Sequence, residues 1–247
     1  LYLPGHNERS PVQPLQRQLF GDRPTQFVET PFSGEDGAVS TLHDGRLYRT
    51  ATAKITRNGK TASASRRIRL EQADVRMTRR ILQQSYYLAA VQLLPETPPW
   101  GALSGVRPTK LATKALLSGG SEKDAERMLR DVYFVTPERR RLCLDASRHT
   151  LEAARLLEPN DLSVYIGIPF CPTRCAYCSF VSESVERFGE FLPPYLDCLL
   201  REIEYTGALL ARSGWHIRSR DMGGGTPTTL STPLMARLLD AIRGSVD

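Results

Sequence analysis

The sequence has no long apolar run: nothing in it approaches the roughly 18 apolar residues of a membrane-crossing helix. Its start, Leu1-Tyr-Leu-Pro-Gly-His6, lacks the charged segment followed by an apolar segment that marks a signal peptide. Cysteine is also scarce. The five cysteines are an odd number, and three are closely spaced, which argues against a disulfide scaffold. These absences predict reduced thiols, a cytoplasmic location and no membrane partner.

Histidine is equally sparse, and its four positions form no metal-ligand spacing. The rest of the composition is ordinary for a globular protein, with 40% hydrophobic and 24% charged residues. A chain of 247 residues can hold one or two domains and can bury a sizeable core.

Acidic residues are scarce in one part of the chain. Residues 51–150 carry 19 Lys and Arg against 9 Asp and Glu, whereas residues 151–247 carry 9 against 12. A basic region can steer an anionic partner, such as a polycarboxylate tetrapyrrole or a nucleic acid. A solvated helix face is the favoured interpretation of this charge, and nucleic acid is not expected as a partner.

The first part of the chain favours an N-terminal α+β domain over residues 1–160. Residues 1–36 are rich in Pro and Gly and show little periodicity. Asp44-Gly45 and Asn58-Gly59 are hairpin signals and predict antiparallel strands over residues 38–70. Further along, apolar spacing and cap residues predict helices over residues 71–94, 108–117, 121–132 and 136–157.

The second part, residues 161–247, alternates between strand and helix patterns. An apolar strand is expected over residues 162–168 and a second within 215–222, and helices are expected over 188–212 and 233–243. A strand–helix–strand–helix order is typical of a parallel α/β arrangement, with the chemistry at the strand ends.

Three cysteines directly follow the first of these strands. Cys171, Cys175 and Cys178 have C-x3-C-x2-C spacing, and thiolates are soft ligands that select zinc or iron–sulfur clusters. A zinc site usually takes its four ligands from two spaced pairs, and no second pair lies nearby. Cys143 and Cys198 stand alone in helical stretches and are predicted to be buried thiols. Three thiolates suit a four-iron cluster with one iron left open for a small molecule, although structural zinc remains an alternative.

The flanking motifs resemble the radical S-adenosylmethionine (SAM) superfamily and, within it, the oxygen-independent coproporphyrinogen III oxidase family. They are Tyr165-x-x-Ile-Pro-Phe-Cys171 and Gly223-Gly-Gly-Thr-Pro-Thr228. Gly105-Val-Arg107-Pro-Thr-Lys110 adds a likeness to the HemZ-type coproporphyrinogen dehydrogenases. The resemblance implies a partial (β/α)6 barrel, of which residues 161–247 would form only the first βα units. The chain is therefore expected to be an N-terminal fragment that is truncated at its C-terminus.

The resemblance also implies the site residues and the chemistry. A [4Fe-4S] cluster would be ligated by Cys171, Cys175 and Cys178. SAM would chelate its fourth iron. SAM would contact Tyr165, Tyr177, Gly224, Gly225 and Thr226. For the two tyrosines, core packing is an equally reasonable role. An external electron donor would reduce the cluster, which would cleave SAM to a 5′-deoxyadenosyl radical. This radical would oxidise the propionates of coproporphyrinogen III with loss of carbon dioxide.

Two departures from the family pattern leave the reaction open. Phe180 stands where the bacterial oxidases have a fourth cysteine, and Gly167 replaces a histidine that often precedes Ile-Pro-Phe-Cys. A haem chaperone of the same family is thus an alternative, and RNA binding by the basic first domain is another. Arg107 and Lys110 could pair with propionates, but a helix-start role in packing is favoured.

Overall fold

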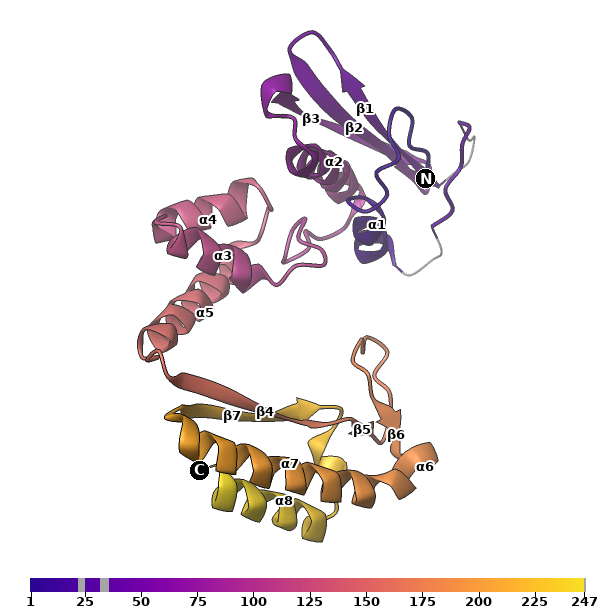
Figure 1. Cartoon of the computed structure of the whole chain (residues 1–247). Helices are drawn as coiled ribbons and strands as arrows, with labels where there is room; N and C mark the ends of the chain where they lie inside the picture. The colour runs from indigo at the N-terminus through magenta and orange to yellow at the C-terminus, as the bar shows by residue number, and fades with distance from the viewer. Residues whose placement is uncertain (22–24, 32–35, 247) are drawn as a thin grey trace. The chain divides into compact units, whose positions relative to one another are not determined.

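The computed structural model describes residues 1–21, 25–31 and 36–246, and its fold is mixed α/β (Figure 1). It divides into two compact units, Leu1–Ala153 and Ala154–Asp247. Parts of the Pro- and Gly-rich stretch, including Pro24 and Gly34, lie outside the described residues.

The first unit contains the predicted antiparallel meander. Its strands are β1 (Gly37–Asp44), β2 (Tyr48–Arg57) and β3 (Lys60–Arg69), in the order β1-β2-β3. The β2–β3 turn has positive φ at both central residues, 50° at Asn58 and 73° at Gly59. This is the geometry that an Asn-Gly hairpin signal predicts, because these residues tolerate the left-handed region.

Two helices, α1 (Gln13–Phe20) and α2 (Val75–Ala90), pack on one face of this sheet. Short 3-10 turns, η1 (Leu70–Gln72) and η2 (Val91–Leu93), flank α2, so the helix predicted over residues 71–94 is α-helical only in its middle. The helix α1 was not predicted and lies in the stretch that shows little periodicity. The shared core combines alternate strand residues with residues of both helices: Ala38, Ala53, Ile55, Leu15, Leu19, Tyr86 and Ala90.

The predicted helices that follow are all present as α3 (Pro108–Leu117), α4 (Glu122–Asp131) and α5 (Pro137–Arg155). Ser121 and Asp124 form a capping box at the start of α4. Two glutamines of α2 connect this helical layer to the rest of the unit. The Gln83 side chain donates to the Ala102 carbonyl at 2.8 Å, and the Gln84 side chain donates to the Val132 carbonyl at 2.9 Å.

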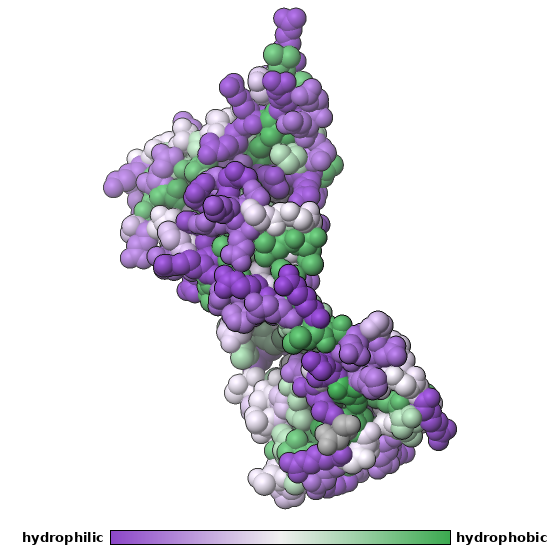
Figure 2. All heavy atoms as spheres, turned by 90° about the vertical axis from the view of Figure 1, so that its left-hand side faces the viewer, coloured by the Kyte–Doolittle hydropathy of each residue, from purple (hydrophilic) through white to green (hydrophobic). Residues whose placement is uncertain are grey.

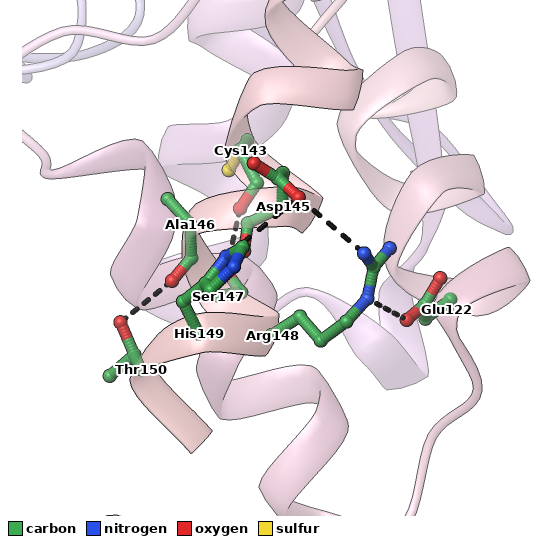
Figure 3. A network of polar contacts seen from close by, with 8 residues as sticks. All are labelled: Glu122, Cys143, Asp145, Ala146, Ser147, Arg148, His149 and Thr150. Atoms are coloured by element: carbon green, nitrogen blue, oxygen red, sulfur yellow. Dashed lines mark hydrogen bonds and ion pairs between the residues drawn. The ribbon is translucent and has the colours of Figure 1, made fainter. Parts of the chain in front are cut away.

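Polar contacts also join α5 to α4, as Figure 3 shows. Arg148 extends from α5 to Glu122 at 3.2 Å and to Asp145 at 3.4 Å. The Ser147 hydroxyl of α5 donates to the carbonyls of Cys143 and Thr109. These contacts connect α5 to α4 and to the start of α3.

The second unit is built on two parallel strands, β4 (Asp161–Ile168) and β7 (His216–Gly224). The helices α7 (Leu192–Ser213) and α8 (Thr232–Ser245) cover one face (Figure 1). Their core contains inward residues of the strand and of both helices: Ile166, Ile168, Leu196, Ile203, Leu238 and Ile242. Gly207 in α7 allows the end of α8 to approach closely, because a Cβ at this position would lie 2.0 Å from the Ser245 carbonyl oxygen.

Short elements connect β4 to α7: β5 (Phe170–Cys171), β6 (Glu183–Ser184), α6 (Val185–Phe188) and η3 (Gly189–Phe191). The long helix therefore begins at Leu192, later than residue 188, with Pro193 and Pro194 in its first turn. A short 3-10 turn, η4 (Pro227–Thr229), connects β7 to α8. The strand–helix–strand–helix order of the second unit is thus as predicted, with extra short segments around the cysteines.

None of the helices in the described ranges is both long enough and apolar enough to cross a membrane. On the face drawn in Figure 2, hydrophobic residues form separate patches among hydrophilic ones.

Candidate metal and cofactor site

The three cysteines of the C-x3-C-x2-C motif lie on one loop at the carboxyl end of β4. Cys171 ends the short strand β5, and the Cys178 amide donates to the Cys175 carbonyl at 3.0 Å. All three thiols are free; Cys175 is exposed, and Cys171 and Cys178 are half-buried. The loop therefore presents three accessible sulfur donors within eight residues.

The loop does not bring these donors together into a metal-binding geometry. Across residues 1–21, 25–31 and 36–246, no three His, Cys, Asp or Glu side chains are grouped so that they could hold a metal ion. Metal binding is coupled to folding, because the unfolded chain rarely holds a preformed site, so a bound metal can itself order its ligands. Closure of the loop is therefore a requirement for any site that uses all three cysteines.

The glycine-rich turn after β7 lies directly against the cysteine segment. The Gly225 amide donates to the Ile168 carbonyl at 2.8 Å, and the Thr226 amide donates to the Phe170 carbonyl at 2.7 Å. The Thr226 hydroxyl also lies 3.5 Å from the Cys171 sulfur. Two motifs that are more than 50 residues apart in the sequence are thus joined by backbone hydrogen bonds.

Glycine is required in this turn for steric reasons. A Cβ at Gly225 would lie 2.5 Å from the Phe170 carbonyl oxygen and 2.9 Å from that of Ile168. Gly224 has a φ of 101°, a conformation that side-chain-bearing residues rarely adopt. The two glycines therefore allow the backbone of β7 to approach the strand that leads into the cysteine loop.

The two tyrosines assigned to SAM are not core residues of this chain. Tyr165 is 61% exposed and Tyr177 is 91% exposed. The hydroxyl of Tyr165 lies over Gly223, where an added Cβ would meet it at 2.6 Å. Neither tyrosine is therefore packed in the core of this chain. Tyr165 lies on the open face of the β4–β7 pair.

One residue that supports the site was not predicted. The Tyr195 hydroxyl of α7 donates to the Gly167 carbonyl at 2.6 Å, and its ring packs edge-on against Phe170 at 5.5 Å. Burial raises the pKa of Tyr195, so this hydroxyl remains a donor at neutral pH. It positions the end of β4 just before the cysteines.

The two other cysteines differ in their surroundings. Cys143 is buried in the helical core of the first unit, as predicted. Cys198 is exposed on α7, so the prediction that it is buried was wrong. Its sulfur accepts a contact from Arg201 at 3.2 Å on the solvent side of the helix.

Arg107 and Lys110 stand in the first unit, at the start of α3. Arg107 is the N-cap residue and Pro108 is the first helical residue. Both basic side chains are exposed. This arrangement fits the helix-start role that the sequence favoured for the motif.

The donor set fits a thiolate-bound iron–sulfur cluster in type and number. Soft sulfur ligands, an accessible loop and an adjoining turn of backbone amides and glycines are all present. In the sequence, no second Cys/His pair, which a zinc site normally requires, lies near the three cysteines.

Comparison with known proteins finds several curated relatives. The chain is 35% identical to the oxygen-independent coproporphyrinogen-III oxidase-like protein HemZ of Bacillus subtilis over 146 residues, 58% of this chain and 29% of that protein. It is 36% identical to the oxygen-independent coproporphyrinogen III oxidase of Escherichia coli over 93 residues, 38% of this chain and 20% of that protein. It is 39% identical to the heme chaperone HemW of E. coli over 84 residues, 33% of this chain and 21% of that protein.

No family model and no solved structure matches the chain. The chain spans less than a third of the length of each of these three curated relatives. Curated homologues of this chain thus include HemZ, oxygen-independent coproporphyrinogen III oxidase and HemW, which are proteins of the radical SAM family.

Proposed function

We propose that this chain carries the cluster-binding and first SAM-binding segments of a radical SAM coproporphyrinogen III dehydrogenase. The observation that carries the proposal is the direct contact between the two motifs. The amides of Gly225 and Thr226 donate to the carbonyls of the segment that leads into Cys171. A cofactor bound to a cluster on the cysteine loop would therefore lie beside this turn.

In this proposal Cys171, Cys175 and Cys178 hold a [4Fe-4S] cluster after the loop closes. The bound cluster and SAM together supply the radical chemistry that oxidises a substrate propionate. Gly224 and Gly225 leave room for a ligand close to the backbone, and the Thr226 hydroxyl stands near the Cys171 sulfur. The exposed rings of Tyr165 and Tyr177 are available for contact with SAM.

The β4–β7 pair and its two covering helices form the first βα units of a partial (β/α)6 barrel in this proposal. The tetrapyrrole substrate would bind at the open face that carries Tyr165. An external electron donor and a reducing cytoplasm suit a protein whose five cysteines are all free thiols. A dehydrogenase is preferred to a haem chaperone because the HemZ likeness extends over 58% of this chain, whereas the HemW likeness extends over 33%.

The test is reductive SAM cleavage by the chain after anaerobic cluster reconstitution. With dithionite as reductant, we expect 5′-deoxyadenosine and methionine to form, and the electron paramagnetic resonance spectrum of the reduced cluster to change when SAM is added. The triple variant Cys171→Ala, Cys175→Ala, Cys178→Ala should form neither product. Stoichiometric haem binding by a chain that does not cleave SAM would instead support the haem-chaperone alternative.

A further inference from the structure

The most basic part of the molecule is the second hairpin of the first unit. Residues 45–70, which include β2, the turn and β3, contain no Asp or Glu. They contain eight basic residues: Arg46, Arg49, Lys54, Arg57, Lys60, Arg66, Arg67 and Arg69. Charges on an edge strand protect a sheet from pairing with other chains, which accounts for cations on β3. Protection of an edge strand does not account for Lys54, because Lys54 lies on β2, the central strand.

One face of this sheet is covered and the other is open. Ala38, Ala53 and Ile55 belong to the core that α1 and α2 complete, so the alternate positions of each strand point away from the helices. Lys54, Arg67 and Arg69 occupy these outward positions. In the strand register, Tyr48 pairs with Arg69 and Thr50 pairs with Arg67.

The outward face carries cations, hydroxyls and the Tyr48 ring, together with Val39 and His43 on β1. The Arg67 guanidinium lies over the Tyr48 ring, 4.7 Å from its centroid. Thr52 and Ser65 are hydrogen-bonded across the strands at 2.8 Å, which extends the polar surface along the hairpin. No carboxylate occurs among the outward positions of the three strands.

The cations on this face are available to a ligand. In the described part of the chain, neither Lys54 nor Arg67 has a carboxylate within ion-pair distance. Arg69 contacts Glu71 at 3.5 Å, but both side chains are well exposed, and such a surface pair is weak. An anion would therefore find three cations with little competition from the protein's own acids.

We propose that this open face, defined by Tyr48, Lys54, Arg67 and Arg69, binds single-stranded RNA. Basic side chains would contact successive phosphates, and the Arg67–Tyr48 stack offers a platform on which an unpaired base can lie. The Thr and Ser hydroxyls can hydrogen-bond to the 2′-hydroxyls that distinguish RNA from DNA. A sheet surface suits a single strand with splayed bases better than a duplex, whose bases are enclosed.

The experiment is a fluorescence anisotropy titration of the whole chain with a labelled oligouridylate of about 20 nucleotides. The test variant is the triple Lys54→Gln, Arg67→Gln, Arg69→Gln. We expect its Kd to rise about tenfold or more, and the slope of log Kd against log salt to fall by about two, since three phosphate contacts are lost. Tyr48→Ala should weaken binding without changing the salt slope, because it removes stacking and no charge.

A matched triple, Lys123→Gln, Arg127→Gln, Arg141→Gln, removes the same charges from exposed positions on α4 and α5. It should change the Kd by less than about twofold. Thermal unfolding of both triple variants should match that of the wild-type chain, because all six substituted side chains are exposed. Equal losses in the two triples, equal or tighter binding of oligothymidylate or duplex RNA, or no binding at low salt would each overturn the proposal.

Discussion

At the scale of single residues, His6 links the N-terminal segment to the sheet of the first unit. Its Nδ1 accepts a hydrogen bond from the Glu8 amide at 3.2 Å, and its Nε2 lies 3.1 Å from the Ser40 carbonyl. This pattern requires a neutral ring with the proton on Nε2, because a protonated Nδ1 cannot accept. Burial also lowers the pKa of His6 from its ordinary value.

We therefore expect acid to destabilise the first unit through His6. The pKa of His6 is lower in the folded state than in the unfolded state, so the neutral ring stabilises the fold. This stability is fully present above about pH 6.5 and is lost as the pH falls through the pKa of the folded state. Urea unfolding at pH 7 and pH 5 should show a smaller loss of stability for His6→Gln than for the wild type. Parallel losses in the two proteins would show that His6 does not couple folding to pH.

The two isolated cysteines provide a second test at this scale. Cys143→Ser should lower the free energy of unfolding by about 1–3 kcal/mol, because it places a hydroxyl in an apolar core. Cys198→Ser should change it by no more than about 0.5 kcal/mol, since Cys198 is exposed. Chemical denaturation measures both effects. Neither change should reduce the iron content of the reconstituted protein, and a loss of iron in either would mean that it is a ligand.

At the scale of elements, the turn after β7 determines how closely the two motifs can approach. Gly225→Ala should lower the stability of the second unit by about 1–3 kcal/mol, because the new methyl group would clash with two carbonyl oxygens. Gly244→Ala is the matched control, since its Cβ would point into open space in α8. It should be neutral or stabilising by up to about 1 kcal/mol. Equal stability of the two variants, measured by urea unfolding, would contradict the close approach.

Elements whose signals are local were predictable from the sequence. Asn58-Gly59 specifies its own turn, and Ser121 with Asp124 specifies the start of α4. The helix α1 was missed because its two buried leucines are embedded in a Pro-rich stretch and are stabilised by distant residues of α2 and the sheet. Tyr195 was missed for a similar reason, since its hydrogen bond to Gly167 spans 28 residues.

The exposure of Cys198 also depends on more than local pattern. Cys198 stands between Asp197 and Leu199-Leu200, so the local pattern does not reveal whether its side of α7 faces the core. Leu196 is fully buried and Cys198 lies outside, as the packing of α7 on the strands and α8 dictates. The cysteine motif and its spacing were evident in the sequence, whereas its contact with Thr226 required the structure.

At the scale of the whole molecule, the β4–β7 pair has one face covered by helices and one face open. Parallel strands are normally covered on both faces. We expect residues 1–247 to cleave SAM in an uncoupled reaction and not to convert coproporphyrinogen III. Product analysis beside the E. coli oxygen-independent coproporphyrinogen III oxidase as a positive control checks this. Full conversion at a comparable rate would show that the two strands and their helices suffice for the reaction.

The most direct test of the central claim is the metal content of the chain after anaerobic reconstitution with iron and sulfide. We expect about four iron atoms and four sulfides per chain, with a Mössbauer spectrum typical of a four-iron cluster. The triple Cys171→Ala, Cys175→Ala, Cys178→Ala variant should retain almost none, and Cys143→Ser with Cys198→Ser should retain all of it. Stoichiometric zinc on the same three cysteines, or iron that persists in the triple variant, would contradict the account.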